Sequence, residues 1–570
     1  MRLHLRSNRP IVAALLWTAL AAPPAAAQPG APPPEVAAAQ AALRAGQPDS
    51  AITTLLAYFT KNPQATAGRL VLGNAYRQRG DLDKALSTFL GITQPRPMQL
   101  QAMFNAAAIH AVRGNAAGAI TLLMRLKESG AFDMNLAKSS KDFAALSTNP
   151  RFAAAMFQPA DFIKPFVEPA VILREFTGET AGDQFSWIAR SIGDVNGDGV
   201  SDLVTSAPTY GATSPTASKG RVYVYSGLTG ALLWNVTGAD GESLGLGLEG
   251  AGDVNRDGVG DVIAGAPGGN RAYVYSGRDG SVLHTLAGTT ATEGFGRSAS
   301  SAGDQNGDGY VDLIVGAPAS AVRGEASGRA YVFSGRDGAV MRILNGAKAG
   351  DAFGSIVAGD KRGTRTRLVV GASGAGPSRG TTPPPGRVYV YNAGRSTPAF
   401  QIDAELTGGA LGAMFASLVG DVNHDGVTDV YAADFSDAAK GPNTGRVYVH
   451  SGKTGKRLLT LVGEHANDGF GIGSADVGDA NGDGFADLLI GAWQYSAAAA
   501  SGGRVYLYSG KDGALLRTIT GRVPGETLGF DATGIGDVNG DGLVDLLITS
   551  SWSNVNGFRS GRMYIVAGTR

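Results

Sequence analysis

The sequence predicts a multidomain chain, α then β: a short α-helical repeat segment followed by a large all-β domain of seven four-stranded units. Three observations predict this class. A helical period of 34 residues runs from residue 35 to about residue 130, and a nine-residue acidic string recurs from residue 171 to the end. The composition, with 84 Gly and 26 Pro among 570 residues, favours short strands joined by tight turns.

The first 27 residues have the pattern of an export signal. Three arginines precede a short apolar run over residues 11–22, and the alanines at 25–27 offer an A-x-A cleavage site. The run is shorter than the about 20 residues that cross a membrane as a helix. We expect export to the periplasm or beyond, with residues 28–34 as a Pro-rich linker.

Residues 35–157 carry the helical period. The small residues that recur at the 34-residue interval are Gly46, Gly80, Gly114, Ala51, Ala85 and Ala119. The glycines are expected to end the first helix of each pair, an Asp or Asn after the glycine to cap the second, and the alanines to let the two helices approach. This segment resembles tetratricopeptide repeats, which implies a groove for a peptide or protein partner. The alternative is a helical spacer that packs on the next domain.

After these repeats we expect a terminal capping helix in the string SSKDFAALSTNPRF, and then an extended connector over residues 158–169. The β domain is expected to fill residues 170–570. Its acidic string has the form DxNxDGxxD. Six intact copies begin at Asp194, Asp253, Asp304, Asp421, Asp479 and Asp537, and a degenerate copy, DKRGTRTRL, begins at Asp360.

Each unit repeats the same accessories in the same order. An aromatic turn such as Phe295-Gly296 precedes the acidic string, and a short apolar strand after it ends in a turn such as Gly316-Ala317-Pro318. An alternating strand follows, GRVYVYSG at Gly220 for example, and then a fourth apolar strand. Alternation with a period of two is the signal of antiparallel sheet, and radial repetition of four-stranded sheets gives a β-propeller.

These units resemble FG-GAP repeats, like those of the integrin α-subunit propeller. The resemblance implies seven blades and a ligand-binding or adhesion module. The last unit stops after its third strand, whereas residues 171–176 supply a spare strand before the first unit. We therefore expect residues 171–176 to pair with residues 561–566 and close the ring.

The acidic string is suited to binding calcium. Side-chain oxygens at positions one, three, five and nine and the carbonyl at position seven can converge, and Gly at position six allows the sharp turn. All-oxygen ligands without imidazole suit a hard cation, Ca²⁺ in particular. About six structural calcium ions are expected. The predicted ligands are Asp194, Asn196, Asp198, Val200, Asp202, Asp253, Asn255, Asp257, Val259, Asp261, Asp304, Asn306, Asp308, Tyr310, Asp312, Asp421, Asn423, Asp425, Val427, Asp429, Asp479, Asn481, Asp483, Phe485, Asp487, Asp537, Asn539, Asp541, Leu543 and Asp545.

Other interpretations of the string are weaker. An EF-hand needs a Glu at position twelve, which here lies in an apolar strand, and a dockerin loop needs a helix after it. A single copy of the string would read as an Asx turn, but six copies in one register favour a metal. In the degenerate fourth unit we expect Arg362 or Arg365 to pair with Asp360 and no calcium to bind.

The sequence favours a binding protein over an enzyme. None of the six histidines lies in a nucleophile or zinc pattern, and a formal net charge of zero gives no reason to expect nucleic-acid binding. Two alternatives remain: a polysaccharide- or phospholipid-active hydrolase or lyase, since FG-GAP propellers accompany some of these enzymes, and a two-domain periplasmic scaffold.

The ligand, a protein or a glycan, is expected on the rim opposite the acidic loops, where the loops between strands two and three vary most. Aromatic side chains on such loops are candidate contacts. They are Tyr210, Phe435, Trp493, Tyr495, Trp552 and Phe558. The alternative is that they cap the blade edges. The recurring arginines that precede the alternating strands are expected to build the blades. They are Arg221, Arg329, Arg387, Arg446, Arg504 and Arg562.

Overall fold

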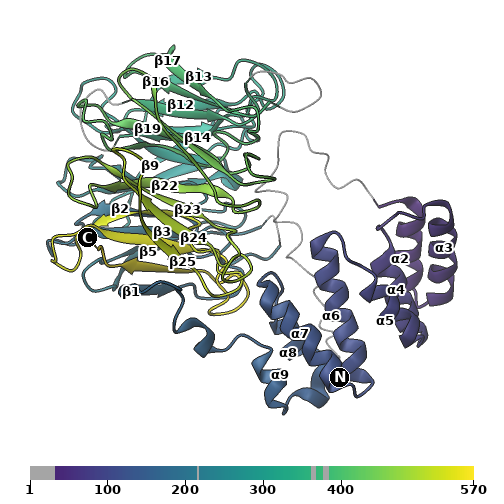
Figure 1. Ribbon diagram of the computed structural model, residues 1–570. Coiled ribbons are helices and arrows are strands. Elements are labelled where there is room, and N and C mark those ends of the chain that lie inside the picture. The colour runs from purple at the N-terminus through teal and green to yellow at the C-terminus, as the bar shows by residue number, and fades with distance from the viewer. Residues whose placement is uncertain (1–31, 215–216, 361–366, 377–383, 570) are drawn as a thin grey trace, which may run out of the picture. The chain divides into compact units, whose positions relative to one another are not determined.

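The structure is a computed structural model that describes residues 32–214, 217–360, 367–376 and 384–569. They form two compact units, one helical up to Ile163 and one built of β-sheet from Lys164 onward (Figure 1). A helical repeat segment followed by a seven-bladed propeller confirms the expected fold class. The expected export signal lies outside the described residues.

Three helix pairs follow one another in the helical unit and pack pairwise. Gly46, Gly80 and Gly114 have positive φ angles of 74°, 94° and 74° and close the first helix of each pair, as expected. The cap of the second helix varies: Asn115 accepts the Gly118 amide at 2.9 Å, whereas no cap bond forms at the equivalent Asp81. The helices are α2 (Pro34–Arg44), α3 (Pro48–Lys61), α4 (Arg69–Arg79), α5 (Leu82–Leu90), α6 (Arg96–Val112) and α7 (Ala116–Ser129).

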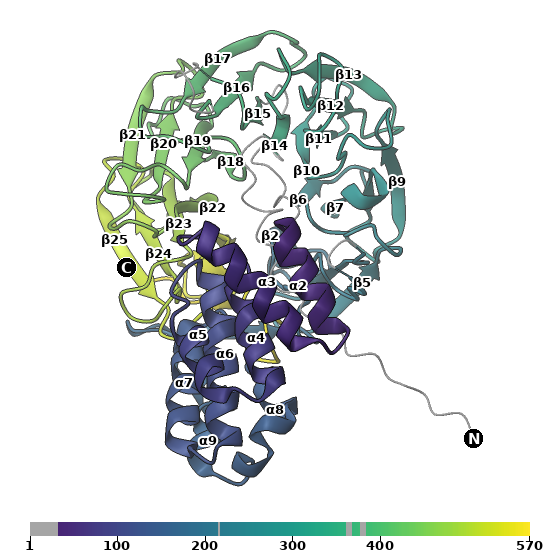
Figure 2. The ribbon, with the colours of Figure 1, turned by 90° about the vertical axis from the view of Figure 1, so that its right-hand side faces the viewer.

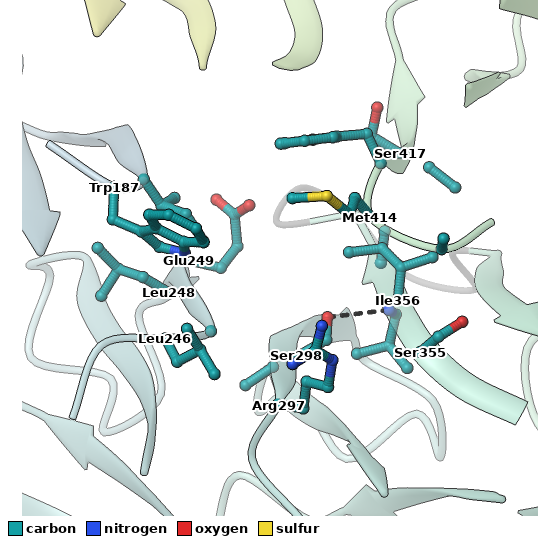
Figure 3. Close-up of a pocket in the computed structure, with 18 of the residues that line it drawn as sticks. Trp187, Leu246, Leu248, Glu249, Arg297, Ser298, Ser355, Ile356, Met414 and Ser417 are labelled. Carbon is teal, nitrogen blue, oxygen red and sulfur yellow. Dashed lines mark hydrogen bonds between the residues drawn. The ribbon is translucent and has the colours of Figure 1, made fainter. Parts of the chain in front are cut away.

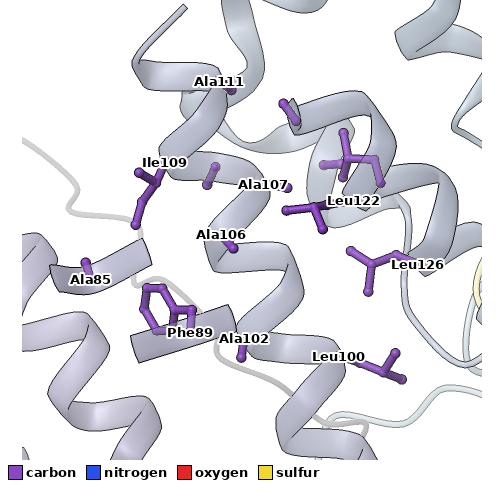
Figure 4. Close-up of a cluster of buried hydrophobic side chains, with 14 of the residues drawn as sticks. Ala85, Phe89, Leu100, Ala102, Ala106, Ala107, Ile109, Ala111, Leu122 and Leu126 are labelled. Carbon is purple, nitrogen blue, oxygen red and sulfur yellow. The ribbon is translucent and has the colours of Figure 1, made fainter. Parts of the chain in front are cut away.

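Small residues let these helices pack closely. Ala51, Ala85 and Ala119 have no exposed surface. A Cβ atom at Gly73 would lie 2.4 Å from the Phe89 ring, so α4 and α5 can meet at this distance only with glycine there. Figure 4 shows Phe89 facing the alanines of α6 in the buried cluster.

The expectation of a single capping helix after the repeats is wrong, because local caps divide the segment into several short helices. Ser140 and Asn149 each accept a backbone amide two residues ahead and start new short elements. Pro150 follows Asn149 and cannot continue a preceding helix, since it lacks an amide hydrogen. The elements found are α8 (Asn135–Ser139), η1 (Lys141–Leu146), α9 (Pro150–Ala154) and η2 (Pro159–Phe162).

The β unit contains seven antiparallel four-stranded sheets arranged in a ring (Figure 2). The first six blades are β2 (Ala189–Gly193), β3 (Asp202–Ala207), β4 (Arg221–Tyr225), β5 (Leu232–Thr237); β6 (Leu248–Gly252), β7 (Asp261–Ala266), β8 (Arg271–Tyr275), β9 (Val282–Ala287); β10 (Ser298–Gly303), β11 (Asp312–Ala317), β12 (Arg329–Phe333), β13 (Val340–Asn345); β14 (Phe353–Gly359), β15 (Leu368–Ala372), β16 (Arg387–Tyr391), β17 (Pro398–Asp403); β18 (Ala416–Val419), β19 (Asp429–Asp434), β20 (Arg446–His450), β21 (Arg457–Val462); and β22 (Phe470–Gly478), β23 (Asp487–Ala492), β24 (Arg504–Tyr508), β25 (Leu515–Thr520).

The seventh blade joins the two ends of the unit, as the spare strand predicts. It consists of β26 (Ala532–Gly536), β27 (Asp545–Ser550), β28 (Arg562–Val566) and β1 (Ile172–Thr177). The pairing of β1 with β28 is antiparallel and runs from Ile172 opposite Val566 to Thr177 opposite Arg562. The ring is therefore closed by hydrogen bonds between its first and last strands.

The recurring arginines build the blades, as expected. Arg221 contacts Glu179 at 2.9 Å, and the Tyr223 hydroxyl donates to the same carboxylate at 2.9 Å. The sixth blade repeats this arrangement: Arg504 contacts Glu464 at 2.9 Å, and the Tyr506 hydroxyl donates to the same carboxylate at 3.0 Å. Each group ties the third strand of a blade to the segment that enters it, so these arginines are occupied inside the fold.

Candidate functional site

Each acidic string forms the turn between the first and second strands of its blade. In the first blade the amides of Gly197 and Gly199 both donate to the Asp194 carboxylate at 2.7 Å. The Asp198 amide donates to Asn196 Oδ1 at 2.8 Å. The same pattern recurs in the other intact strings. The string is therefore a wound turn whose carboxylates face inward onto its own backbone.

The last carboxylate of the string closes the base of the turn. Asp202 accepts the Val195 amide at 2.9 Å and the Gly227 amide, from the hairpin after β4, at 3.0 Å. Asn196 Nδ2 lies 2.9 Å from Asp198 Oδ2 and 3.4 Å from Asp202 Oδ1. The carboxylates at positions five and nine thus converge on one amide group.

The carboxylates at position nine are buried without exception in the six intact strings. Burial raises the pKa of Asp261, Asp312 and Asp429 to about 6, and the neighbouring carboxylates of each string add to the rise. The pKa rises in the same direction, and first through burial, for Asp202, Asp487 and Asp545. Each turn therefore holds a buried carboxylate whose charged form is disfavoured by its surroundings.

Within the described residues, no three His, Cys, Asp or Glu side chains are arranged so that they could hold a metal ion. The carboxylates accept backbone amides instead, and the residues at position seven, such as Val200, donate their amide to position five. The donor set is still all oxygen, with three carboxylates and an Asn per turn, which is the chemistry that suits Ca²⁺. The residues fit calcium by type, and the calcium site stays a prediction.

The degenerate fourth string differs from the other six. Asp360 Oδ2 accepts the Thr428 hydroxyl of the next blade at 3.2 Å. Arg362 and Arg365, expected to pair with Asp360, lie outside the described residues.

On the opposite rim the predicted aromatic residues divide into two groups. The guanidinium groups of Arg221 and Arg504 lie 3.7 and 4.1 Å from the ring centres of Tyr210 and Tyr495. These two tyrosines therefore pack against the recurring arginines of their own blades. Phe435 packs partly buried in a blade core.

Trp493 and Trp552 belong to a four-ring cluster that joins the sixth, seventh and first blades. Their ring centres are 4.9 Å apart, and the Trp493 ring lies 5.6 Å from Phe530. Phe530 in turn contacts Trp187 at 4.6 Å. Arg559, next to Phe558 in the chain, lies over Trp552 at 4.1 Å, and burial lowers the pKa of its guanidinium to about 10.

Trp187 and Phe530 also line a cavity of about 100 Å³ in the centre of the ring (Figure 3). Trp187 precedes β2, whereas Asp194 follows it, so the cavity lies toward the end of the strands opposite the acidic turns. Six blades contribute to its wall. The turn before the first strand opens with Phe or Leu in every blade, followed by Ser in the first blade and by Gly in the other six. The residue after this pair occupies one equivalent position in all seven blades, which are in order Trp187, Leu246, Arg297, Ser355, Ala413, Ile472 and Phe530.

Sequence reasoning missed this position because it treated the residue as part of the turn. A signal was present: one cation and two aromatic rings stand where the other units have small or aliphatic residues. In the wall of the same cavity, Arg190 forms ion pairs with Glu249, at 2.7 Å, and with Asp531. That arginine is therefore already neutralised by the fold.

Among the described residues, no helix combines the length and apolarity needed to cross a membrane. A tetratricopeptide repeat model matches residues 36–97, an FG-GAP repeat model matches residues 191–225 and 295–333, and an FG-GAP-like repeat model matches residues 421–490.

Integrin α-subunits are similar to part of the β unit. Integrin alpha-2 of Bos taurus is 30% identical over 165 residues, which are 26% of this chain and 14% of that protein. Integrin alpha-4 of Xenopus laevis is 34% identical over 163 residues, 26% of this chain and 15% of that protein. Integrin alpha-5 of Xenopus laevis is 27% identical over 258 residues, 42% of this chain and 19% of that protein. The chain thus matches less than a fifth of each of these relatives. With a closed ring of seven blades beside these matches, the chain contains FG-GAP repeats within a seven-bladed β-propeller that is similar in part to integrin α-subunits, and tetratricopeptide-like repeats on the N-terminal side of the propeller.

Proposed function

We propose that this chain is an exported, calcium-binding β-propeller that binds a protein or glycan ligand on the rim opposite its acidic turns. The observation that carries the proposal is the division of the propeller into two unlike ends. One end carries six copies of the same acidic turn. The other carries loops of different length and sequence around an aromatic cluster and a cavity.

Calcium is supported by the chemistry of the turns. Three carboxylates per turn include one that is fully buried, and a nearby divalent cation would stabilise its charged form. The thirty predicted ligand positions would hold about six ions, one for each intact turn. When bound, each ion would link the first two strands of its blade through the turn. The fourth turn would bind none.

A binding role is favoured over catalysis by the placement of the histidines. His450 is buried, burial lowers its pKa, and its Nδ1 lies 2.9 Å from the Gly455 carbonyl oxygen. His284 Nε2 lies 2.7 Å from the Gly335 carbonyl oxygen. Both are thus engaged with backbone, and neither lines the central cavity. The integrin α-subunits that match the propeller suggest an adhesion or interaction module.

Export and a second partner complete the proposal. The basic, apolar and A-x-A pattern of residues 1–27 supports secretion to the periplasm or beyond. The tetratricopeptide-like unit supports a groove for a peptide or protein. We propose that the helical unit spans residues 35–157, the connector residues 158–169 and the propeller residues 170–570.

Elemental analysis tests the calcium assignment. The mature protein, dialysed against trace calcium, should retain about six calcium ions per chain. Asp479→Ala should retain one fewer, because it removes the first ligand of one turn. The control Asp240→Ala removes a carboxylate whose side chain is 86% exposed and should retain six. Two or fewer ions, or zinc in their place, would overturn the assignment.

A ligand screen tests the binding function. The calcium-loaded protein should retain a protein or a glycan from arrays of both, through the propeller unit. A double substitution in the aromatic cluster, Trp493→Ala with Trp552→Ala, should reduce that binding at least tenfold, whereas Trp234→Phe, in an outer strand of the first blade, should not. Turnover of polysaccharides or phospholipids by the purified protein would contradict the binding role.

A further inference from the structure

One charged side chain in the central cavity has no counter-charge. Arg297 follows the aromatic turn of the third blade and projects into the cavity (Figure 3). In the part of the chain that the structure describes, its guanidinium forms no ion pair and no hydrogen bond, and burial lowers its pKa. Arg190, which lines the same cavity, is held by two carboxylates. The third-blade arginine is thus a half-buried cation with free donors that face the cavity.

The polar side chains that line the cavity with Arg297 are engaged with other groups, Glu249 with Arg190 among them. The Ser355 hydroxyl donates to the Gly412 carbonyl oxygen at 2.6 Å, and Ser298 Oγ accepts the Val357 amide at 3.0 Å. Both serines are therefore engaged within the sheets. A guanidinium needs acceptors in a plane, and burying it without them is costly. A ligand that carries two oxygens in a plane would satisfy it.

The rest of the wall limits what that ligand can be. Trp187, Leu246 and Met414 make the cavity apolar beside the guanidinium. A volume of about 100 Å³ admits a few heavy atoms rather than a sugar chain. In the same wall, Arg190 pairs with two carboxylates, Glu249 and Asp531. This group carries a net negative charge, which would repel a multiply charged anion.

We propose that this cavity binds a single carboxylate group on a short apolar stem, with Arg297 holding both carboxylate oxygens. Bidentate pairing of guanidinium with carboxylate is the geometry that arginine favours. The stem lies against Trp187 and Met414. This inference rests on the proposed binding function and names the chemistry that the ligand presents. The carboxylate comes either from a small free acid or from the side chain of a Glu in a protein ligand.

The test measures binding to the full-length mature protein with calcium present. The two probes are butyrate, and the blocked peptide acetyl-Ala-Glu-Ala-amide, each followed by calorimetry and by Trp fluorescence. Butyramide and acetyl-Ala-Gln-Ala-amide are the uncharged controls. At least one acidic probe should bind saturably and its uncharged partner should not. Arg297→Gln should weaken binding tenfold or more, because a hydrogen-bonded charge pair is lost.

A matched control separates this effect from a general change of charge. Arg336→Gln makes the same change in the same blade at an exposed turn and should bind the probes as the parent does. Near-UV circular dichroism checks that both variants keep the propeller fold. Binding of the peptide alone assigns the carboxylate to a protein ligand, and binding of butyrate alone assigns it to a free acid.

The inference fails if neither acidic probe binds, or if Arg297→Gln binds them as tightly as the parent. These outcomes are distinct from failure of the proposed function. If neither acidic probe binds, and a partner from the arrays binds Arg297→Gln as tightly as the parent, the binding role stands and this inference falls. If the probes bind through Arg297 but no partner is found on the arrays, this inference stands and the proposed binding of a protein or glycan ligand falls.

Discussion

At the scale of single residues, position four of each acidic turn needs an unusual backbone conformation. Gly197 and Gly307 have φ angles of 81° and 82°, and Arg256 and His424 adopt φ angles of 64° and 59° at the equivalent positions. A left-handed conformation costs a residue with a Cβ about 1–2 kcal/mol. Two of the six intact turns therefore carry backbone strain that the others avoid.

The first prediction concerns this strain. Gly307→Ala should lower the free energy of unfolding by about 1–2 kcal/mol, because a Cβ there meets nothing within 4 Å and only the backbone preference changes. Arg256→Ala is the matched control. Residue 256 already has a left-handed backbone conformation and a Cβ atom, so the backbone contribution to the free energy of unfolding should not change. Urea unfolding measures both. Equal stability of Gly307→Ala and the parent would show that the turn relaxes to another conformation.

At the scale of elements, four of the seven blades meet the next blade through a glycine in their second strand, which is Gly265, Gly316, Gly371 or Gly491. The Gly296 amide donates to the Gly316 carbonyl oxygen at 3.1 Å, which ties the aromatic turn to the second strand of its own blade. A Cβ at Gly316 would lie 2.1 Å from the Gly354 carbonyl oxygen of the following blade, and one at Gly265 would lie 1.8 Å from that of Gly296. The paired glycine motifs are thus the contact through which one blade's second strand meets the next blade's turn.

The second prediction follows from this contact. Gly316→Ala should cost about 3 kcal/mol or more, because the atom it meets is backbone and cannot rotate away. The first blade has Ser206 at the equivalent position, so Ser206→Ala is the control and should change stability by less than about 1 kcal/mol. Thermal unfolding by calorimetry distinguishes the two. A tolerated Gly316→Ala would mean that the blades can shift apart.

At the scale of the whole molecule, the propeller depends on joining its ends. Phe176 of β1 is buried in the core between the seventh and first blades, and Glu175 pairs with Arg562 of β28 at 2.8 Å. Without β1, β28 would become an exposed edge strand that presents unpaired amides and carbonyls, which favours aggregation.

The third prediction tests this closure. A chain that begins at Gly178 should unfold at lower temperature than one that begins at Val171, and should aggregate. Both lack the helical unit, and only the second keeps β1, so the comparison isolates the closing strand. Light scattering and calorimetry give the two readouts. Identical melting of the two chains would mean that β1 adds nothing to the ring.

The fourth prediction rests on the proposed calcium sites. At a free calcium concentration about ten times the Kd, each site adds about 1.4 kcal/mol to the free energy of unfolding, or roughly 8 kcal/mol for six sites. This is comparable to the whole stability of a typical domain, about 5–15 kcal/mol. Chelation should therefore lower the propeller transition steeply, followed by near-UV circular dichroism, to which the four described tryptophans, all in the propeller, contribute.

Within the same experiment, Asp479→Ala should lower the transition only modestly, because five sites remain. The helical signal of residues 34–162 should persist after chelation. A propeller transition that chelator leaves unchanged would mean that the hydrogen bonds to Asp194 and its equivalents are enough to order the turns, and the calcium proposal would fall.

The amino-acid sequence by itself determined the blades, their number and their closure. Each blade is encoded by local signals that recur in one order, from the aromatic turn to the alternating strand, and a spare strand before Gly178 matches the strand missing after Val566. The acidic turns and the blade-building arginines could be recognised for the same reason. Repetition reveals what every unit has in common, because each copy forms the same local structure.

Only the tertiary structure decided what the units do not share. Trp187 and Phe530 lie 4.6 Å apart although 343 positions separate them, because closing the ring brings the first and seventh blades together. Arg297 reads in the sequence as one more turn residue, and its lack of a counter-charge emerges only when six blades enclose a cavity around it. These contacts are set by the packing of whole blades against one another, and no local pattern in the chain encodes that packing.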